Sequence, residues 1–275
     1  MKYKIGTVAK LLGVSPQALR LYERNGILVS DRGDGENGYR YYGRLDITAL
    51  TRARAYHQYG FSMKETEALI NTGDVQFIHQ QYELRQEALE AEIRLKQQIL
   101  NYLKSISQLL KELDSQLWTI RPAIRPGIYR LEFMQGDELI LNSRQQEVFP
   151  QWTGLAPFAF PSQRNSWKSL MEGRDESFSA LGILEEDAKA LGMPDCLAAG
   201  SYYPPVPCLC TVVEVSEENA SCVQYLSHLK DYIEKHRITV TGDPFCRTFL
   251  SMNKKENYRR YRQTWIPVAV DGLPA

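Results

Sequence analysis

The chain has 275 residues, 43% of them hydrophobic and 24% charged, which are the proportions of an ordinary globular protein. Its 33 basic and 33 acidic residues cancel to a formal net charge of zero, so the chain as a whole is not a basic nucleic-acid-binding protein. No apolar run approaches the roughly 18 residues that a membrane-spanning helix needs, so we expect no membrane partner.

The charge is unevenly distributed along the chain. Residues 1–60 contain ten Lys and Arg residues against five Asp and Glu residues. A positive segment on a neutral chain is typical of DNA contact confined to one end. The start is charged rather than an apolar signal segment, and the five cysteines, an odd number, all follow residue 195. We therefore expect a cytoplasmic protein, long enough for two domains and a connector.

Residues 5–24 have the pattern of two short helices separated by a turn. Apolar residues at helical spacing fill the first segment, and Gly13-Val14 interrupts it. Ser15 can cap a second helix that has Pro16 at its first position, where the missing N–H costs nothing. Two short helices with a glycine turn form a helix-turn-helix unit, whose second helix fits a DNA major groove. The polar side chains expected on the outside of that helix are Gln17, Arg20 and Arg24.

A wing is expected directly after this unit. Ile27-Leu28-Val29 favours a strand, residues 31–38 form a polar glycine-rich turn, and Tyr39-Arg40-Tyr41-Tyr42 forms the return strand. An arginine flanked by tyrosines suits a sugar-phosphate backbone, because the guanidinium pairs with phosphate and the phenol hydroxyls donate to it.

Together these segments resemble the winged helix-turn-helix of the MerR family of transcription regulators. The residues that carry the resemblance are IGTVAKLLGVSPQALRLYERNGIL and the later GYRYY. The resemblance implies a DNA-binding domain at residues 1–73 that binds a palindromic operator in promoter DNA, where RNA polymerase also binds. A winged helix used for protein contacts is the alternative. The expected DNA-binding residues are Gln17, Arg20, Tyr22, Arg24, Tyr39, Arg40 and Tyr41.

Two further helices are expected at residues 44–59 and 62–72, and a much longer one at residues 75–119, which contain no Gly or Pro. Apolar residues in the long segment alternate at spacings of four and three, as in a coiled coil. Such a stripe must be buried against another helix, and the simplest partner is a second copy in antiparallel pairing. The MerR resemblance implies the same homodimer. The alternative is packing of the stripe on the C-terminal domain of the same chain. The stripe comprises Leu84, Ala88, Ala91, Leu95, Ile99, Leu103, Ile106, Leu110, Leu113 and Leu117.

Residues 120–127 are rich in proline and are expected to form a linker that ends the long helix. Residues 128–275 are expected to form a second domain of mixed strands and helices, so the predicted fold class is α+β. The expected strands are 128–134, 178–184, 208–215, 245–252 and 261–270; the expected helices are 167–171 and 219–236, and an irregular aromatic segment is expected at 147–161.

This second domain resembles the effector-binding domain that multidrug-sensing members of the MerR family share with gyrase-inhibitory-like proteins. The features that carry the resemblance are AAGSYY, a helix followed by GDPF, and a last strand that ends in WIPV. The resemblance implies duplicated βαβ-type halves with an aromatic cleft between them, which binds a small aromatic or lipophilic effector. The expected ligand-binding residues are Tyr129, Glu132, Trp152, Trp167, Tyr202, Tyr203, Glu214, Tyr225, Gln263 and Trp265.

The charge of the effector is a separate question. Glu132 and Glu214, both on expected strands, are the carboxylates that could attract a cation, while aromatic rings attract cations through their faces. Drug-sensing relatives carry a glutamate where this chain has Gln263, so strict selection for cations is not expected and neutral ligands become candidates.

Two other functions remain open from the sequence. Cys208 and Cys210 would share one face of a strand, where their thiols could hold a metal ion or sense redox state. Against this, residues 72–125 lack the cysteines that metal-sensing relatives carry at the dimer helix. Alternatively, the C-terminal domain could sequester or hydrolyse its ligand. No Gly-rich phosphate loop, HExxH or Gly-x-Ser-x-Gly motif is present, so we expect no enzyme, no catalytic residue, no cofactor and no metal site.

These expectations combine into an effector-responsive transcription regulator, an activator by resemblance. The resemblance implies that effector binding rearranges the dimer and distorts promoter DNA so that polymerase can use it. Such a switch requires an effector with different affinities for two dimer conformations, and DNA contacts that offset the deformation.

Overall fold

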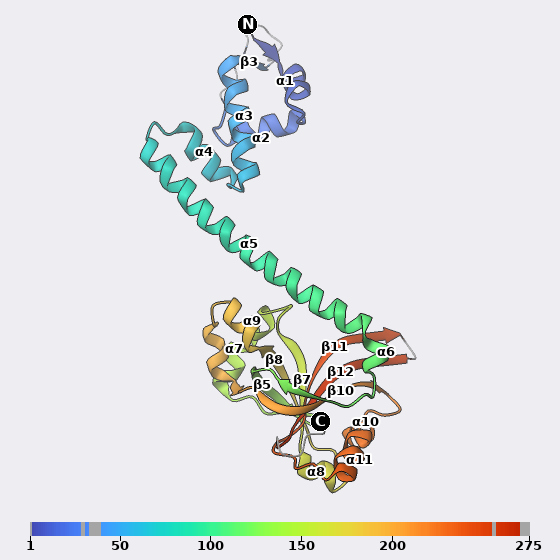
Figure 1. The fold of residues 1–275 in the computed structure, drawn as a ribbon. Helices are drawn as coiled ribbons and strands as arrows, with labels where there is room; N and C mark the ends of the chain where they lie inside the picture. Colours follow the sequence, from blue (N-terminus) through green and yellow to red (C-terminus); the bar gives the residue numbers. More distant parts are fainter. Residues whose placement is uncertain (1, 29–30, 33–39, 255–256, 270–275) are drawn as a thin grey trace. The chain divides into compact units, whose positions relative to one another are not determined.

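A computed structural model describes residues 2–28, 31–32, 40–254 and 257–269. The chain divides into two compact units, Met1–Arg94 and Leu95–Ala275, and the boundary falls within the long helix α5 (Val75–Lys111). Figure 1 gives the order of the elements along the chain. Within the described ranges, no helix combines the length and the apolar character needed to cross a membrane.

The first unit contains a small winged helix-turn-helix domain. Its strands pair in the order β1-β3-β2, and both described pairings are antiparallel. The tip of the wing, between β2 and β3, lies outside the described residues. The elements are β1 (Tyr3–Lys4), α1 (Ile5–Leu12), α2 (Pro16–Arg24), β2 (Asp31–Arg32), β3 (Arg40–Tyr42), α3 (Arg44–Tyr59) and α4 (Met63–Asn71).

Short-range capping contacts set the helix boundaries of this unit. The Ser15 hydroxyl oxygen accepts the Ala18 N–H at 3.1 Å at the start of α2. Gly13, between α1 and α2, has a φ of 62°, a conformation that favours glycine. Ser62 and Glu65 cap the start of α4 reciprocally. The predicted cap at Ser15 and the predicted helix starts are therefore confirmed.

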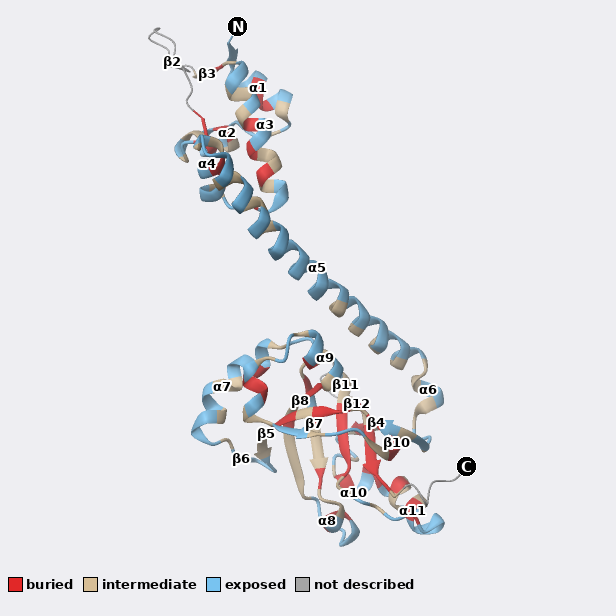
Figure 2. Ribbon diagram, turned by 60° about the vertical axis from the view of Figure 1, so that its left-hand side comes forward, coloured by how far each residue is buried: buried red, intermediate tan, exposed pale blue. Residues whose placement is uncertain are grey.

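Helix α5 has 37 residues, and none of them is fully buried. Figure 2 shows it almost entirely in the exposed and intermediate colours, in contrast to the strands that follow. Leu84, Leu95 and Leu103 of the predicted stripe are exposed, Leu103 to 58%. Ile99 is different, because together with Tyr102 it packs on a buried cluster of the second unit. The intramolecular alternative therefore applies around Ile99, while much of the stripe lacks cover in the described chain.

The long helix ends earlier than the sequence predicts. It stops at Lys111, and a short helix α6 (Leu113–Gln116) follows. Trp118 then has a φ of 60° and donates its backbone N–H to the Val212 carbonyl at 2.8 Å. A left-handed residue cannot continue an α-helix, and the hydrogen bond draws the chain onto the sheet.

The segment 120–127 differs from the predicted linker. It contains the strand β4 (Arg121–Arg125), which pairs antiparallel with β10 (Val206–Ser216). Because β4 lies at the edge of the sheet, one of its sides has no neighbouring strand. Pro122, which has no backbone N–H, is tolerated in such an edge strand. The expectation that this proline-rich segment ends the helix as a linker is therefore wrong, because the helix ends at Lys111 and the segment forms an edge strand.

The second unit is built on one nine-stranded sheet. Its strands lie in the order β4-β10-β12-β11-β7-β8-β5-β6, with β9 pairing to β5, and all the described pairings are antiparallel. The remaining elements are β5 (Ile128–Gln135), β6 (Glu138–Leu139), α7 (Ser143–Gly154), β7 (Phe160–Asn165), α8 (Trp167–Met171), β8 (Ser177–Leu184), α9 (Glu185–Ala190), a 3₁₀ helix η1 (Asp195–Ala199), β9 (Ser201–Tyr203), α10 (Cys222–Tyr225), α11 (Ser227–His236), β11 (Phe245–Lys254) and β12 (Asn257–Pro267).

The same order of elements occurs twice in this sheet. One half contains β5, α7, β7 and β8, and the other contains β10, α10 with α11, β11 and β12. In the first half β8 lies between β5 and β7, and in the second half β12 lies between β10 and β11. The two halves meet where β11 pairs with β7. In both halves the helical segment connects the first strand to the second, and the third strand separates these two in the sheet.

Helix α7 replaces most of the irregular segment expected at residues 147–161. Asn142 and Gln145 form a capping box that starts it, and Pro150 lies inside it. Trp152 anchors the helix, since its ring is fully buried and its indole N–H donates to the Cys196 carbonyl at 2.9 Å. Because prolines and aromatic residues are frequent in this segment, the sequence pattern does not predict a helix there.

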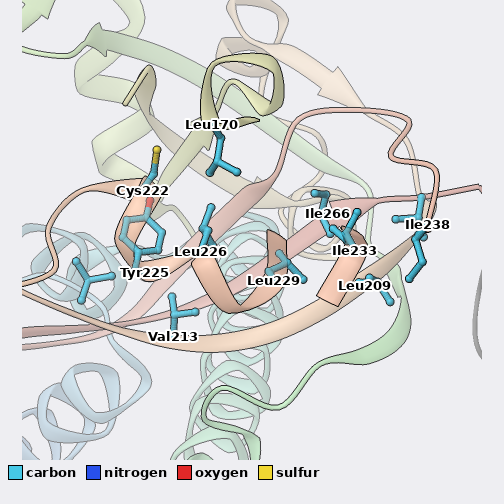
Figure 3. Packing of buried hydrophobic residues seen from close by; sticks show 12 residues of the cluster. Leu170, Leu209, Val213, Cys222, Tyr225, Leu226, Leu229, Ile233, Ile238 and Ile266 are labelled. Atoms are coloured by element: carbon cyan, nitrogen blue, oxygen red, sulfur yellow. The ribbon is translucent and has the colours of Figure 1, made fainter. Parts of the chain in front are cut away.

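The sheet has two distinct faces. We call the side that packs against α7, α10 and α11 the helix face. There Val213 and Ile266 pack on Leu229 and Ile233 of α11, as Figure 3 shows, while Leu131 in the other half belongs to the cluster around the α7 anchor. Side chains that alternate with these point to the opposite side, which we call the arginine face.

Candidate DNA-binding surface and effector site

Helix α2 presents a polar stripe to solvent. Gln17, Arg20 and Arg24 are all exposed, and their spacing of three and four residues places them on one side of the helix. Leu19, fully buried, holds the opposite side against the domain core. Two guanidinium groups and one amide on an exposed helix match the chemistry that reads phosphates and base edges.

Tyr22 differs from the other expected DNA-contacting residues on α2. It is only 8% exposed and belongs to the domain core, with its ring centroid 5.9 Å from that of His57. Burial raises the pKa of the Tyr22 phenol, while the nearby Arg54 opposes this shift. The structure therefore packs most of the Tyr22 side chain into the domain core, and a DNA contact of its hydroxyl stays a prediction.

The wing strand β3 is tied to α2 through Glu23. Arg40 forms an ion pair with Glu23, with 2.8 Å between Nε and Oε2, and the Tyr42 hydroxyl donates to Oε1 of the same carboxylate at 2.9 Å. Burial and this hydrogen bond raise the pKa of Tyr42. Arg40 remains partly exposed, so it is held in place and still accessible to a phosphate. Tyr41 is half-buried, and Tyr39 lies outside the described residues.

A network of charged groups occupies the arginine face of the second unit. Arg130, 1% exposed, contacts Glu132 at 2.8 Å and donates to the Ser162 hydroxyl at 3.1 Å. Arg164 also contacts Glu132 at 2.8 Å and reaches Asp243 at 2.7 Å. Burial tends to raise the pKa of Glu132, but the two arginines hold it below its usual value. Glu132 is thus already neutralised and offers little attraction to a cation.

Aromatic rings stack on these arginines. The guanidinium carbons of Arg130 and Arg125 lie 4.6 and 4.8 Å from the centre of the Phe245 ring, and that of Arg164 lies 3.9 Å from the Phe178 ring. The Tyr203 ring meets the Phe245 ring edge-on at 4.6 Å. The rings stabilise the cations that they contact. The arginine face is therefore aromatic, as expected for an effector site, but positive in charge.

A cavity of about 250 Å³ lies where α5 meets this face. Tyr102 of α5, Asp187 of α9 and Arg247 of β11 are among its lining residues. Burial raises the pKa of Asp187 to about 6, with a further contribution from Glu186, while Arg247 opposes the shift. Burial lowers the pKa of Arg247, and its Nε has no hydrogen-bond partner among the residues described. The cavity therefore places Arg247, whose Nε lacks a hydrogen-bond partner among the described residues, beside α5.

The ten expected ligand-binding residues fall into three groups. Strand register and ring contacts place five of them on the arginine face: Glu132, Tyr203, Glu214, Gln263 and Trp265. Tyr129 and Tyr202 stack at 4.7 Å beside a separate open hollow near η1. Trp152 and Tyr225 are fully buried, and Trp167 packs against the α11 cluster, so these three contribute to the cores.

The second expected carboxylate is also paired. The Tyr261 hydroxyl donates to Glu214 at 2.7 Å, and Arg259 lies 3.4 Å from the same group. Gln263 points its amide toward Cys210, with 3.8 Å between Nε2 and Sγ. Neither expected carboxylate is thus left as an unpaired negative charge in the described structure.

The thiols of Cys208 and Cys210 are buried on the arginine face. Burial, followed by the neighbouring Cys210, raises the pKa of Cys208 to about 12, and burial likewise raises that of Cys210. The Cys208 thiol donates to the Ala123 carbonyl at 3.4 Å. Since metals and oxidants react with thiolates, these protonated thiols are poorly suited to metal or redox sensing.

Sequence reasoning missed the buried arginines. Arg125, Arg130, Arg247 and Arg262 are at most 6% exposed. In the sequence three of them are basic residues within expected strands, and Arg125 lies in the expected linker. A basic residue in a strand is usually exposed at the edge of a sheet, so the pattern did not indicate burial. Their burial follows from strand pairings between segments far apart in the chain.

The comparisons with known proteins concern mainly the first unit. Residues 3–72 match the family model described as MerR HTH family regulatory protein. The chain is 40% identical over 67 residues to the HTH-type transcriptional regulator CueR of Escherichia coli, covering 24% of this chain and 49% of that protein. It is 32% identical over 74 residues to the mercuric resistance operon regulatory protein of Bacillus cereus, covering 27% of this chain and 55% of that protein. The chain thus spans about half the length of these curated relatives.

A solved structure of the EcmrR–DNA complex aligns with 97% of this chain and 99% of its own, with 16% identity and a TM-score of 0.38. The family match coincides with the elements from β1 to α4, and with the exposed stripe on α2. Residues 3–72 of this chain are therefore a MerR-family helix-turn-helix domain.

Proposed function

We propose that this chain is a transcription regulator that binds promoter DNA through residues 3–72 and senses a small molecule through its second unit. The observation that carries the proposal is the coincidence of the MerR family match with the exposed Gln17, Arg20 and Arg24 on α2. The proposal makes the chain a regulator rather than an enzyme, acting with RNA polymerase at the same promoter.

The proposed DNA-binding form is a homodimer. The exposed apolar side chains of α5, including Leu84, Leu95, Leu103 and Leu110, support it, because an apolar stripe on a long helix is stabilised by a second helix. Antiparallel pairing of two copies would relate their DNA-binding domains by a two-fold axis, which suits a palindromic operator.

The proposed effector is a planar aromatic or lipophilic molecule of the multidrug type, bound on the arginine face. The stacked rings of Tyr203 and Phe245 and the cavity beside Tyr102 support this placement. Because Glu132 is neutralised by two arginines, the proposal favours neutral or anionic effectors over cations. Occupancy of a cavity lined by α5 would bias the arrangement of the dimer, and so the shape of bound DNA.

The first experiment tests DNA binding by the full chain. Sequences selected from a random duplex pool should contain a palindrome. Anisotropy titrations should show that the logarithm of the affinity falls by about 0.9 per phosphate contact for each tenfold rise in salt concentration. Failure to enrich any duplex sequence would contradict the proposal.

The second experiment tests the dimer. Light scattering of the purified chain should give twice the mass of 31.6 kDa, and Leu103→Glu should shift the protein toward the monomer, whereas the adjacent Lys104→Glu should not. A monomer at micromolar concentration would contradict the proposed antiparallel pairing.

A further inference from the structure

The helix face of the sheet contains a second cavity, on the opposite side from the proposed effector site. Its volume is about 250 Å³, and it lies over strands from both halves of the second unit. The helix-face residues that line it include Phe133, Gln163, Ser179, Thr248, Arg260 and Arg262, and Ser162 and Ala180 at the alternate strand positions also border it. The cavity therefore straddles the junction of the two halves.

Arg262 is the most unusual residue of this cavity. It is 6% exposed, and its Nε and Nη1 atoms have no hydrogen-bond partner in the part of the chain that the structure describes. Its only described stabilising contact is the Tyr225 ring, 5.3 Å away. The equally buried Arg130, by contrast, is paired with a carboxylate. An unpaired buried charge is costly, so Arg262 is poised to receive an anionic partner.

Arg260 adds a second positive charge to the same cavity. Its guanidinium carbon lies 4.4 Å from the centre of the Tyr258 ring. Burial lowers the pKa of Arg260, and the charge of Arg262 lowers it further, as expected for two cations without a counter-ion. Among the described residues that line the cavity there is no Asp or Glu.

The remaining lining groups suit the rest of a small organic anion. Ser179, Thr248 and Gln163 provide hydroxyl and amide donors around the two arginines. Phe133, whose ring meets that of Phe149 edge-on at 5.4 Å, gives the cavity an apolar wall. A carboxylate or a phosphate ester with a compact planar group satisfies both parts of this lining.

We propose that this cavity binds a small organic anion, whose oxygen atoms accept hydrogen bonds from Arg262 and Arg260 and whose planar part contacts Phe133. The site is independent of the proposed effector site, because Arg247 and Arg262 lie on opposite faces of the sheet. It is also independent of DNA binding, since every lining residue belongs to the second unit.

Calorimetric titration of the full-length protein with four related probes tests this site. Benzoate and phenyl phosphate should show binding that depends on Arg260, whereas neutral benzamide and cationic benzylammonium should show none that does. Arg260→Gln should weaken binding of the two anions about tenfold or more, as loss of a charge-assisted hydrogen bond does. The matched control is Arg259→Gln, the neighbouring arginine on the opposite face, which should leave anion affinity unchanged.

Two further variants keep the result interpretable. Arg262→Lys retains the charge with fewer donors and should weaken binding less than Arg260→Gln, provided that its tryptophan fluorescence spectrum is native. Arg247→Gln removes the cation of the proposed effector site, so it can weaken binding there but should leave the Arg260-dependent anion binding unchanged. Equal Arg260-dependent binding of all four probes, no measurable binding of either anion, or loss of anion binding in Arg247→Gln but not in Arg260→Gln would overturn the proposal.

Discussion

The two units use arginine in opposite ways. On α2, Arg20 and Arg24 are exposed, whereas in the sheet Arg130 and Arg262 are almost fully buried. An exposed guanidinium remains hydrated and can meet a phosphate on a large polyanion. A buried one must find its partner within the protein or in a small ligand that enters it. The comparison separates arginines that suit the proposed DNA contacts from arginines that suit internal scaffolding or the proposed ligand site.

The largest expected effect comes from removing a buried arginine that has its partners. Arg130→Ala should lower the free energy of unfolding of the second unit by about 3–5 kcal/mol, because it opens a cavity and leaves Glu132 with one cation fewer. Denaturant unfolding followed by tryptophan fluorescence measures this unit alone, since the four tryptophans are at positions 118, 152, 167 and 265.

Two variants serve as references for that measurement. Arg130→Met restores volume without charge and should recover part of the loss, and the exposed Arg174→Ala should leave stability unchanged. A native-like stability of Arg130→Ala would show that burial does not make this arginine structural, and would remove the contrast with α2.

Removing an exposed arginine should affect DNA affinity rather than stability. Arg20→Ala should weaken binding to a selected operator by about 1–3 kcal/mol, because Arg20 would contact a base edge or a phosphate. Anisotropy titrations at several salt concentrations distinguish a base contact from a phosphate contact. Only the loss of a phosphate contact also lowers the salt dependence of the DNA affinity.

The buried Tyr22 provides the internal control on the same helix. Tyr22→Phe removes only the hydroxyl and should leave DNA affinity unchanged, as should Lys168→Ala in the second unit. If Tyr22→Phe weakened binding as strongly as Arg20→Ala, the assignment of Tyr22 to the core would be contradicted.

A pH effect is expected at Asp187, beside Arg247. Its folded-state pKa of about 6 exceeds the value in an unfolded chain, so the folded state retains this proton as pH rises and loses stability between about pH 4 and pH 6. Asp187→Asn should therefore stabilise the second unit at pH 8, by about 1–2 kcal/mol after allowance for partial solvent screening, and should have no effect near pH 4.

Denaturant midpoints at pH 4 and pH 8 measure this difference, with the exposed Asp195→Asn as the control. A gain that is the same at both pH values would indicate a packing effect of asparagine instead of relief from a buried charge.

The smallest effect concerns a helix cap in the first unit. Ser62→Ala should cost about 1 kcal/mol, because it leaves the Glu65 N–H without its capping oxygen at the start of α4. Thermal unfolding followed by circular dichroism measures the change, and Ser107→Ala on the exposed side of α5 is the control. Equal stability of the two variants would show that the cap is redundant.

The contrast between the units also explains which features the sequence revealed. In the first unit the determining signals are local: the Ser15 cap, the Gly13 turn and the Ser62–Glu65 box each act within four residues. In the second unit, α7 and β4 differ from the prediction. The buried Trp152 anchors α7, and pairing with the distant strand β10 stabilises β4.

By itself, the sequence determined the helix-turn-helix, its family resemblance, the long helix and the positive charge of the first 60 residues. Only the tertiary structure decided that Tyr22 is buried, that Glu132 is neutralised, and that Arg247 and Arg262 lie on opposite faces of one sheet. The physical reason is the separation along the chain over which each interaction acts. Caps and helix periodicity act between near neighbours, whereas the burial and pairing of a charge depend on which distant strands lie beside it.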